Sequence, residues 1–424
     1  MKCIEDEIPF EVPEGWEWAR LRDICMMSAG KYKSSDQIKS EPFQGSYPCF
    51  GGNGVRGYVD EYNQDGIFSI VGRQGALCGN INIAIGKFYA TEHAVVTTLF
   101  AGIDFKWSNY ILEALRLNNY ATGAAQPGLS VANILNVFVP VPPTQAQDRI
   151  GNNVDESLKI VEALEQEKID LQKIIITAKT KILDLAIRGK LVPPDPNDEP
   201  ASVLLKRIRA EKEELIKQGK IKRDKNESVI FKGDDNSYYQ DLPENWQFTS
   251  LREITTSLTL NDGDWILSQN MSNIGDVKLL QLGSIGNMVY IDKGFKYLTK
   301  DIFKELSCTE IFSGYLLINR IISDKMCCCI VPDIDGTIIT TVDTCWIAPS
   351  NTSYDIKFLM YQLASPTFQK EVLLKSSGTT RRRISKNNLI NIALLLPPLA
   401  EQKRIVTAIE EAFSKLDKIS ESLA

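Results

Sequence analysis

The chain has 424 residues, of which 43% are hydrophobic and 24% charged, a balance typical of a soluble globular protein of two or three domains. No apolar run approaches the ~20 residues that a membrane helix needs, and the charged N-terminus is unlike a signal peptide. We therefore expect a cytoplasmic protein without membrane contact. A single histidine, His93, disfavours histidine-dependent hydrolases and multi-histidine metal sites.

Charge and cysteine content refine these exclusions. The net charge of −6 and the pI near 5.3 argue only mildly against nucleic-acid binding, because net charge is a poor guide to the local field. The nine cysteines show no Cys-x-x-Cys spacing. Three of them form the run Cys327–Cys329 inside an apolar stretch, so we expect buried reduced thiols rather than metal ligands.

The second half of the chain repeats the first. The segment PEGWEWARLRDI at 13–24 returns as PENWQFTSLREI at 243–254, an offset of 243 − 13 = 230 residues. Matched ends that frame a diverged interior predict a duplicated globular unit, with one scaffold and two different recognition surfaces. We call residues 13–150 the first repeat and residues 243–405 the second repeat. At the end of each repeat, at a constant offset of 255, identical residues recur in pairs: Ser130 and Ser385, Asn133 and Asn388, Asn136 and Asn391, Pro142 and Pro397, Pro143 and Pro398, Gln147 and Gln402, Arg149 and Arg404, Ile150 and Ile405.

Within the first repeat, strands alternate with Gly and Asn turns, as in residues 66–86, and a helix is expected over about 106–119. The run Phe50–Gly54 fits the Phe-x-Gly-x-Gly signature of S-adenosylmethionine binding in methyltransferases. That signature should follow a buried strand and open a helix, whereas the residues around this run predict a hairpin or loop. The chain also lacks the Asp/Asn-Pro-Pro-Tyr/Phe motif of amino-group methylation, so no cofactor is expected on this chain.

Residues 144–188 contain no proline and predict one long helix. Its apolar residues recur in steps of three, four or seven, as in a coiled-coil seam. The helix predicted over 399–424 begins with the same steps, so we expect the two stripes to pack antiparallel against each other. Two unrelated amphipathic helices, each on its own domain, are the alternative. The residues expected in the coiled coil or in subunit docking are Ile150, Val154, Leu158, Val161, Leu164, Leu171 and Ile175 on the first helix, and Ile405, Ile409, Phe413 and Leu416 on the second.

Residues 189–237 form a proline-rich turn, a charged helix over about 201–218 and a hydrophilic linker. Residues 206–225 hold nine Lys or Arg against four acids, for which a solvated helix face is the favoured interpretation. The second globular domain is predicted over 238–398, with strands in 315–342 and a helix over about 355–375. Near its end, the adjacent residues Arg381–Arg383 and nearby Lys386 favour a phosphate or base contact, because adjacent arginines repel one another unless an anion neutralises them.

The chain resembles the DNA specificity subunit of type I restriction–modification systems. The resemblance covers nearly the whole chain and is most specific in LAIRGKLVPPDPNDEPASVLLKRIRAEKEEL at 185–215, in the Pro-Pro segments ending in Arg-Ile, and in the Pro-Glu-x-Trp openings. The segments YPCFGGNGVRGYVDEY at 47–62 and TEHAVVT at 91–97 also look like one recurrent type of target recognition domain. The second long helix departs from this pattern, because it lacks about 20 residues that its counterpart has.

The resemblance implies a mixed α/β (α+β) fold with two target recognition domains, 1–143 and 238–398, at opposite ends of an antiparallel pair of coiled-coil helices. Each domain would recognise one half of a split double-stranded DNA target. The helices would bind two modification subunits, which carry S-adenosylmethionine and methylate adenine, and restriction and motor subunits would join for cleavage. The chain itself would have no catalytic activity. The alternatives are a self-contained methyltransferase and a coiled-coil scaffold that does not contact DNA.

The candidate DNA contacts lie at matched points of the two repeats. Arg73 and Arg320 each end an apolar strand, and the loops TGAAQPGLS and SGTTRRRIS each lead into a Ser-x-x-Asn turn. Arginine favours guanine, whereas asparagine and glutamine favour adenine, so different side chains at matched points should select different bases. The candidates are Asn53, Arg56, Arg73, Gln74, His93 and Gln126 in the first repeat, and Asn319, Arg320, Lys325, Arg381, Arg382, Arg383 and Lys386 in the second.

Overall fold

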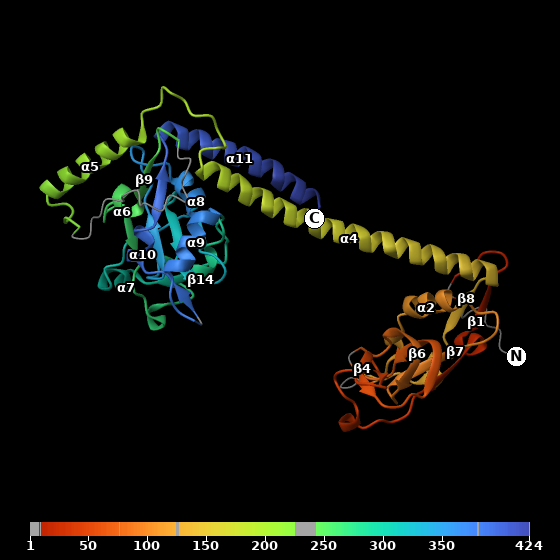
Figure 1. The fold of residues 1–424 in the computed structure, drawn as a ribbon. Coiled ribbons are helices and arrows are strands. Elements are labelled where there is room, and N and C mark those ends of the chain that lie inside the picture. Colours follow the sequence, from red (N-terminus) through yellow and green to blue (C-terminus); the bar gives the residue numbers. More distant parts are fainter. Residues whose placement is uncertain are drawn as a thin grey trace. The chain divides into compact units, whose positions relative to one another are not determined.

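The computed structural model describes residues 8, 10–75, 77–123, 127–224, 243–379 and 381–423, and the chain divides into two compact units (Figure 1). The first unit comprises residues 1–166 and the second comprises residues 167–424, so the division falls inside the 44-residue helix α4 (Thr144–Ile187). In the parts of the chain that the structure describes, no helix combines the length and the apolar composition needed to cross a membrane.

The first unit is built on a six-stranded sheet. Its strands follow the order β2-β7-β5-β6-β3-β4, with antiparallel pairing except between β3 and β6. Ile70, Val71, Val95 and Val96 are buried on its central strands, so opposite faces of the sheet contribute to two separate hydrophobic clusters. The strands are β2 (Cys25–Ala29), β3 (Tyr47–Gly51), β4 (Gly54–Val59), β5 (Gln64–Gly72), β6 (Ile81–Ala90) and β7 (Ala94–Leu99). The run Phe50–Gly54 is the turn of the β3–β4 hairpin, which confirms the hairpin prediction.

A second layer of the first unit brings the two ends of the repeat together. β1 (Glu17–Arg20) pairs antiparallel with β8 (Phe138–Val141), so the Pro-Glu-x-Trp opening lies beside the strand that precedes Pro142. The short helices α1 (Leu21–Ile24) and α3 (Val131–Ile134) flank this pair in sequence. The helix predicted over 106–119 is α2 (Phe105–Ala114), which is followed by a short 3-10 turn at Leu117–Tyr120.

The second unit repeats this topology. Its four-stranded sheet has the order β10-β17-β13-β15, which corresponds to β2-β7-β5-β6, and β9 pairs with β19 as β1 pairs with β8. A separate three-stranded sheet has the order β12-β11-β16. The strands are β9 (Gln247–Ser250), β10 (Leu260–Asp262), β11 (Val277–Leu280), β12 (Lys296–Leu298), β13 (Leu316–Asn319), β14 (Ile321–Ile322), β15 (Cys328–Ile330), β16 (Ile338–Thr340), β17 (Thr344–Ile347), β18 (Arg382–Arg383) and β19 (Ala393–Leu396).

One strand explains why the sheets differ. In the first unit, β6 pairs with β5 along most of its length, and its last residues Tyr89 and Ala90 pair in parallel with β3. In the second unit these two roles fall to separate strands: β15 pairs with β13, and β16 pairs in parallel with β11. The seven residues between them, VPDIDGT at 331–337, interrupt the strand. One continuous sheet therefore becomes two.

The repeated residues perform repeated structural tasks. In the first unit the buried Gln147 accepts a hydrogen bond from the backbone amide of Asp104 (2.8 Å) and donates one to the carbonyl of Pro142 (2.9 Å). Gln402 makes the same two bonds, at the same distances, to Asp355 and Pro397. Each glutamine thus joins the start of a long helix to the N-cap of α2 or its counterpart α8 (Ile356–Ala364). The duplication extends to single hydrogen bonds.

A pair of glycines shows the same correspondence. Gly30 donates to the carbonyl of Ala94 (3.0 Å), and Gly263 donates to that of Thr344 (2.9 Å). A Cβ atom at Gly30 would lie 2.1 Å from the carbonyl oxygen of Ala90, and one at Gly263 would lie 2.5 Å from that of Thr340. Any side chain at either position would collide with the backbone of the neighbouring segment, so both positions require glycine.

The helix predicted over 355–375 is wrong in one respect, because it is two helices. α8 ends at Ala364, and α9 (Pro366–Lys375) begins immediately after Ser365. Pro366 has no amide hydrogen to donate to the preceding turn, whereas it fits the first position of a new helix. The Ser365 hydroxyl caps that helix by accepting from the amide of Phe368. This unit also contains the helices α6 (Leu251–Ile254), α7 (Lys300–Glu305), α10 (Lys386–Ile390) and α11 (Leu399–Ser422).

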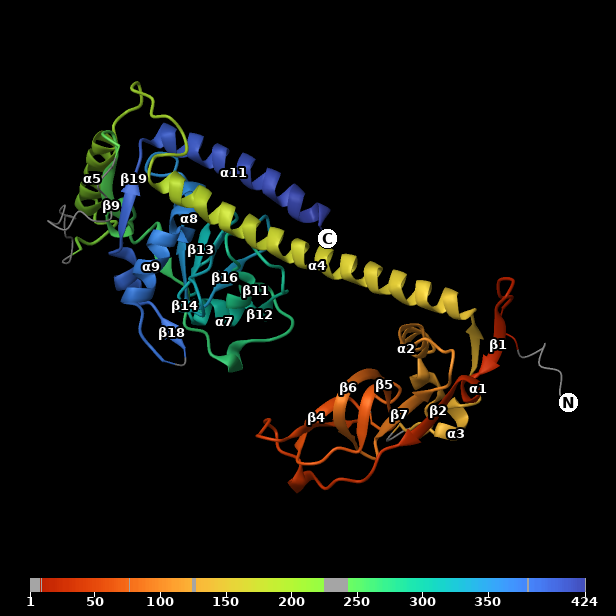
Figure 2. The same ribbon diagram turned by 45° about the vertical axis from the view of Figure 1, so that its right-hand side comes forward.

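Within the second unit, α11 lies antiparallel to the C-terminal part of α4 (Figures 1 and 2). Ile405 and Ile409 share a hydrophobic cluster with Leu183 and Ala186 of α4, and Phe413 packs against it. Lys179 pairs with Asp417, and its ammonium lies 5.1 Å from the centre of the Phe413 ring. These contacts confirm the paired-helix prediction for this part of α4. The seam residues Ile175, Ile405 and Ile409 are buried, and Leu171 and Leu416 are partly buried.

In the middle of α4 the described residues do not bury the apolar stripe, and its expected role in subunit docking stays a prediction. Leu158, Val161 and Leu164 are 45%, 49% and 59% exposed, so no described residue covers them. α11 has 24 residues against the 44 of α4, and a shorter helix cannot cover the whole stripe. Nearer the start of α4, Val154 is partly buried, and Ile150 packs against the core of the first unit.

The segment after α4 covers one face of the second unit. α5 (Ala201–Lys217) buries Ala201, Leu204, Leu205 and Ile208 in the same cluster as Trp246 and Leu251. Each such aliphatic side chain contributes roughly 1–3 kcal/mol on burial. Arg404 anchors the proline-rich turn through two hydrogen bonds to the carboxylate of Asp198 (2.7 and 3.1 Å). The repeated Arg149 of the first unit is exposed, and no carboxylate partner is described for it within the ranges given above.

Candidate nucleic-acid interface

Matching backbone hydrogen bonds place the two strand-end arginines at equivalent positions. The amide of Arg73 donates to the carbonyl of His93 (2.9 Å), and that of Arg320 donates to the carbonyl of Asp343 (2.9 Å). The carbonyls of the same arginines accept from Leu129 (2.8 Å) and Ile384 (3.1 Å), which are 255 residues apart. Arg73 therefore corresponds to Arg320, and His93 corresponds to Asp343. The sequence predicted the first correspondence but not the second.

The two loops expected to match have the same backbone closure. In the first unit the amides and carbonyls of Thr122 and Gly128 bond to each other (2.9 Å in both directions), and in the second Ser377 and Arg383 do the same (2.9 and 2.8 Å). The loops therefore occupy equivalent positions, as predicted. Gln126 lies outside the described residues.

In the first unit, several predicted contacts gather around the β3–β4 turn. Asn53 is exposed at that turn and accepts a hydrogen bond from the side chain of Asn80 (2.9 Å). A Cβ atom on the preceding Gly52 would lie 3.2 Å from the carbonyl oxygen of Gln74 and 3.4 Å from that of His93. The turn thus packs on the segments that carry Arg73, Gln74 and His93. Amide, guanidinium and imidazole groups are therefore brought together on one exposed edge.

Two predicted residues of the first unit have more specific surroundings. The His93 ring lies 3.3 Å from the Glu92 carboxylate and is 40% exposed. Arg56, on β4, donates to the hydroxyl of Ser35 (2.6 Å) in a different loop, and no described interaction links it to the Asn53 turn. The structure therefore places Arg56 on the hairpin but does not join it to the rest of the cluster.

In the second unit, a carboxylate organises the arginine run. Asp343 pairs with both Arg381 (3.3 Å) and Arg383 (3.0 Å). The carboxylate is 22% exposed, whereas the Arg381 side chain is 65% exposed. Arg382 is exposed and has no charged or hydrogen-bonding side-chain partner within the described ranges. One arginine is thus free to meet an anion while its neighbours are held in place.

Arg320 differs from its counterpart Arg73 by being buried. It is 4% exposed, lies 3.2 Å from the Asp262 carboxylate and donates to the carbonyl of Val342. Lys386 donates to the side chain of Asn261 (2.6 Å) and lies 4.0 Å from the same Asp262. The guanidinium of Arg320 therefore holds the surrounding loops and leaves little surface for DNA, whereas Arg73 is only partly buried.

The other two candidates of the second unit, Asn319 and Lys325, lie next to β14. This strand pairs with β18 and so adjoins the arginine run. Asn319 accepts from the amide of Ile321 (2.9 Å), an arrangement that fixes the strand end. Lys325 is exposed in the turn that follows β14. Lys325 is therefore available to a ligand, whereas the Asn319 carbonyl oxygen is already used.

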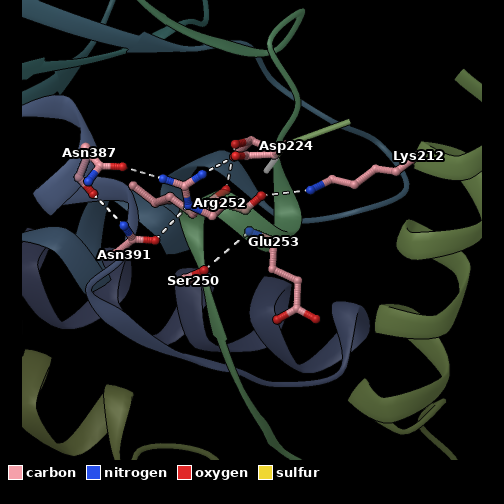
Figure 3. A network of polar contacts seen from close by, with 9 residues as sticks. Lys212, Asp224, Ser250, Arg252, Glu253, Asn387 and Asn391 are labelled. Atoms are coloured by element: carbon pink, nitrogen blue, oxygen red, sulfur yellow. Dashed lines mark hydrogen bonds and ion pairs between the residues drawn. The ribbon is translucent and has the colours of Figure 1, made fainter. Parts of the chain in front are cut away.

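The sequence did not predict a polar network around Arg252 (Figure 3). Arg252 bonds to the side chains of Asn387, Asn391 and Asp224, and its side chain is only 8% exposed. The link to Asn391 recurs in the first unit, where Arg22 donates to Asn136 (2.7 Å). Arg22 and Asn136 recur in the second repeat as Arg252 and Asn391, so the duplication itself could have revealed this pair. The partners Asp224 and Asn387 are specific to the second unit and gave no such signal.

Arg252 and Asp224 of this network line a cavity of about 1070 Å³ in the second unit. Its described walls are α5, the turn after it, and the segment from α6 to Leu260, together with Lys386 and Ile390. Seven cationic side chains and three acidic side chains line the cavity: Arg209, Lys212, Lys220, Lys222, Arg223, Arg252 and Lys386, with Glu213, Asp224 and Glu253.

The cysteines carry no comparable chemistry. Cys328 and Cys329 are buried, as predicted, and Cys327 is partly buried. Burial raises the pKa of the Cys329 thiol to about 12, and likewise that of Cys345, which keeps both protonated and unreactive near neutral pH. Among the described residues, no group of three or more His, Cys, Asp or Glu side chains could hold a metal ion.

Comparisons with known proteins agree with this geometry. The family model for the type I restriction modification DNA specificity domain matches residues 13–173 and 243–423. The chain is 45% identical over 139 residues to the EcoprrI specificity subunit of Escherichia coli, and 32% identical over 273 residues to the EcoAI specificity subunit of the same species. These matches cover 32% and 60% of this chain, but only 34% and 42% of those relatives.

Two solved structures share the fold over nearly the full length. One is the HsdS subunit from Thermoanaerobacter tengcongensis, with a TM-score of 0.55 and 15% identity over 98% of this chain and 93% of that chain. The other comes from a study of complex assembly and conformational transition of the type I R-M system. Its TM-score is 0.57, with 15% identity over 98% of this chain and 94% of that chain.

Proposed function

Because this chain belongs to the family of type I restriction–modification DNA specificity proteins, we propose that it recognises a bipartite DNA sequence, one half with each unit. The observation that supports this most strongly is the shared framework with different exposed groups. The hydrogen bonds that fix Arg73 and Arg320 are the same, yet the first unit presents Asn53, Gln74 and His93 whereas the second presents its arginine run. Two half-sites of different sequence require this combination.

The exposed groups suit base recognition in the major groove. Asparagine and glutamine form paired hydrogen bonds with adenine, and arginine forms them with guanine, each pair contributing about 1–3 kcal/mol of discrimination. The cluster around Asn53 therefore favours a half-site in which adenine is contacted. The loop with Arg382 favours guanine or phosphate. Contacts to phosphate set the affinity, and contacts to base edges set the sequence.

We further propose that the chain is the non-catalytic partner of two modification subunits, and that restriction and motor subunits join the assembly. The exposed apolar stripe of Leu158, Val161 and Leu164 supports this, because an uncovered row on one helix face is a surface for another protein. S-adenosylmethionine would then bind to the modification subunits. The Phe50–Gly54 run supports the same assignment, since it forms a hairpin turn and opens no helix.

Exchanging the interior of the first repeat tests the proposal. Residues 10–140 are replaced by the equivalent segment of a relative, and the methylated sequence is read from the genome of a host that carries the modification system. We expect one half-site to change and the other to stay, because the second unit is unaltered. A host without the gene provides the baseline. A change in both halves, or no sequence-specific methylation that depends on this chain, would contradict the proposal.

A further inference from the structure

The cavity between α5 and the end of the second repeat has an excess of positive charge that its own acids do not neutralise. Three ion pairs use all three acids: Arg209 with Glu253, Arg223 with Glu213, and Arg252 with Asp224. Of the other four cations in the described lining, Lys212 is held by the backbone carbonyl of Arg252 and Lys386 lies 4.0 Å from the Asp262 carboxylate, whereas Lys220 and Lys222 have no described partner. In a concave site, such an excess focuses a positive potential on the space between the walls.

The paired residues hold the walls in place. Arg209 bonds to Glu253 (2.9 Å from Nε) and so ties α5 to α6, while Lys212 donates to the backbone carbonyl of Arg252 (2.7 Å). Arg223 contacts Glu213 through two hydrogen bonds (2.9 and 2.6 Å), which lower the pKa of the Glu213 carboxyl and fix the turn after α5. Figure 3 shows how Arg252 is fixed by Asn387, Asn391 and Asp224.

Two of the remaining lysines are free to meet a ligand. Lys220 and Lys222 line the cavity, both are exposed, and their side chains have no ion-pair or hydrogen-bond partner in the described part of the chain. Lys386, a third, also lines the cavity, but its ammonium donates to the side chain of Asn261 and lies 4.0 Å from the Asp262 carboxylate.

We propose that this cavity binds the DNA phosphate backbone next to the half-site recognised by the second unit, with Lys220 and Lys222 as the contacting residues. The inference rests on the proposed function and adds a contact that is independent of sequence. The described lining residues include no aromatic side chain on which a base could stack. The two contacting lysines are compact point charges, which suit a phosphate group.

The first unit lacks this site. Arg22 keeps the bond to Asn136, but it is 55% exposed, and the position of Lys386 is occupied by Val131. The first unit also has no equivalent of α5 among its described elements. The extra phosphate contact therefore belongs to one half-site only.

The test compares two double variants of the full chain. K220A/K222A removes the two cavity lysines, whereas K206A/K217A removes two exposed lysines of α5 that do not line the cavity. Binding is measured against salt concentration on two duplexes, one with the methylated target and one without it. The logarithm of the binding constant falls linearly with the logarithm of the salt concentration, and each phosphate contact contributes about 0.9 to the steepness of that line. We therefore expect the cavity variant to reduce the steepness by about 1.8 on both duplexes. The α5 control should keep the wild-type slope, and K220R/K222R should restore it.

A second measurement locates the contact. Neutral methylphosphonates are placed one at a time in the strands flanking each half-site. At one or two positions beside the second unit's half-site they should weaken binding of the wild type but not of K220A/K222A. Equal slopes for the two double variants would overturn the inference, as would loss of assembly with the modification subunits without any change in DNA binding. If the wild type itself failed to prefer the target duplex, the proposed function would fail instead.

Discussion

At the point where the chain leaves its central strand, the two units have the same backbone hydrogen bonds but different charged side chains. Arg73 bonds through its amide to His93, and Arg320 bonds in the same way to Asp343. In the second unit the acid gathers Arg381 and Arg383 around itself, whereas in the first unit the equivalent loop position is Gly128 and no arginine run exists. The repeated framework therefore fixes where a loop lies, while the loop's own residues set the charge that it presents.

The surfaces of the two units also differ, although their frameworks match. α5 covers the second unit next to Trp246, and Arg404 is tied to Asp198. In the first unit Arg149 is exposed, and Trp16, the counterpart of Trp246, is only partly buried. Duplication has therefore preserved the interior of each unit better than its surface, as expected when packing constrains the first and partners constrain the second.

The largest expected effect concerns assembly. Replacing Leu158 by Asp places an ionised group in the exposed apolar stripe of α4, and we expect binding to modification subunits to be lost, because an unpaired charge in an apolar interface is costly. The matched control is Ala163→Asp, since Ala163 is exposed and lies on the opposite side of the helix from Val161. Co-purification of the complex measures both. Normal assembly by the Leu158 variant would show that the stripe is not the docking surface.

A smaller but graded effect is expected from the arginine run. Replacing Arg381, Arg382 and Arg383 together by Ala should weaken DNA binding and lower the salt slope by up to about 2.7, because each phosphate contact contributes about 0.9. Arg382→Ala alone should lower the slope by about 0.9, since this side chain is exposed and has no partner among the described residues. Titrations at several salt concentrations give the slopes. A triple variant with the wild-type slope would refute a DNA contact for this loop.

Much of this framework could be predicted from the sequence because repetition exposes it. Gln147 and Gln402 stood out as a recurring pair, and both proved to be buried and to make the same two hydrogen bonds. The long helices followed from their apolar period. The extent of their pairing did not, because Leu158, Val161 and Leu164 have the right spacing whether or not a second helix is long enough to reach them.

The charged partners in the candidate site were harder to foresee. Asp343 follows Arg320 by 23 residues and precedes Arg381 by 38, so no local pattern indicates that the three meet. The burial of Arg320 was also missed, since a strand-end arginine has the same sequence signature whether it points outward or pairs with Asp262. Side-chain pairs formed by distant loops depend on how those loops fold, which periodicity does not encode.

Asp343 itself offers a sharper test of the comparison between the units. Asp343→Asn keeps the shape of the side chain but removes the charge that holds Arg381 and Arg383. We expect binding to unrelated DNA to strengthen, because a negative charge is removed from the surface, while preference for the correct second half-site falls about tenfold as the arginines lose their fixed positions. Competition between duplexes altered in one half-site at a time measures this preference. The exposed Asp335→Asn serves as the control. An equal loss at both half-sites would contradict a role confined to the second unit.

The smallest effect tests whether the shared framework has the same energetic value in both units. Gln147→Leu and Gln402→Leu each remove two buried hydrogen bonds, leaving the amide of Asp104 or Asp355 and the carbonyl of Pro142 or Pro397 without a partner. Each variant should lower the free energy of unfolding of its own unit by about 2–4 kcal/mol, since an unsatisfied buried group costs about 1–3 kcal/mol. The exposed Gln145→Leu should change it by less than about 0.5 kcal/mol.

Hydrogen exchange of backbone amides, followed separately in each unit against denaturant, distinguishes the two. Similar losses would show that the two copies still depend on the same buried pair of bonds. A much larger loss for Gln402 would mean that the second unit, with α5 packed against it, has come to depend on this junction in a way that the first unit has not.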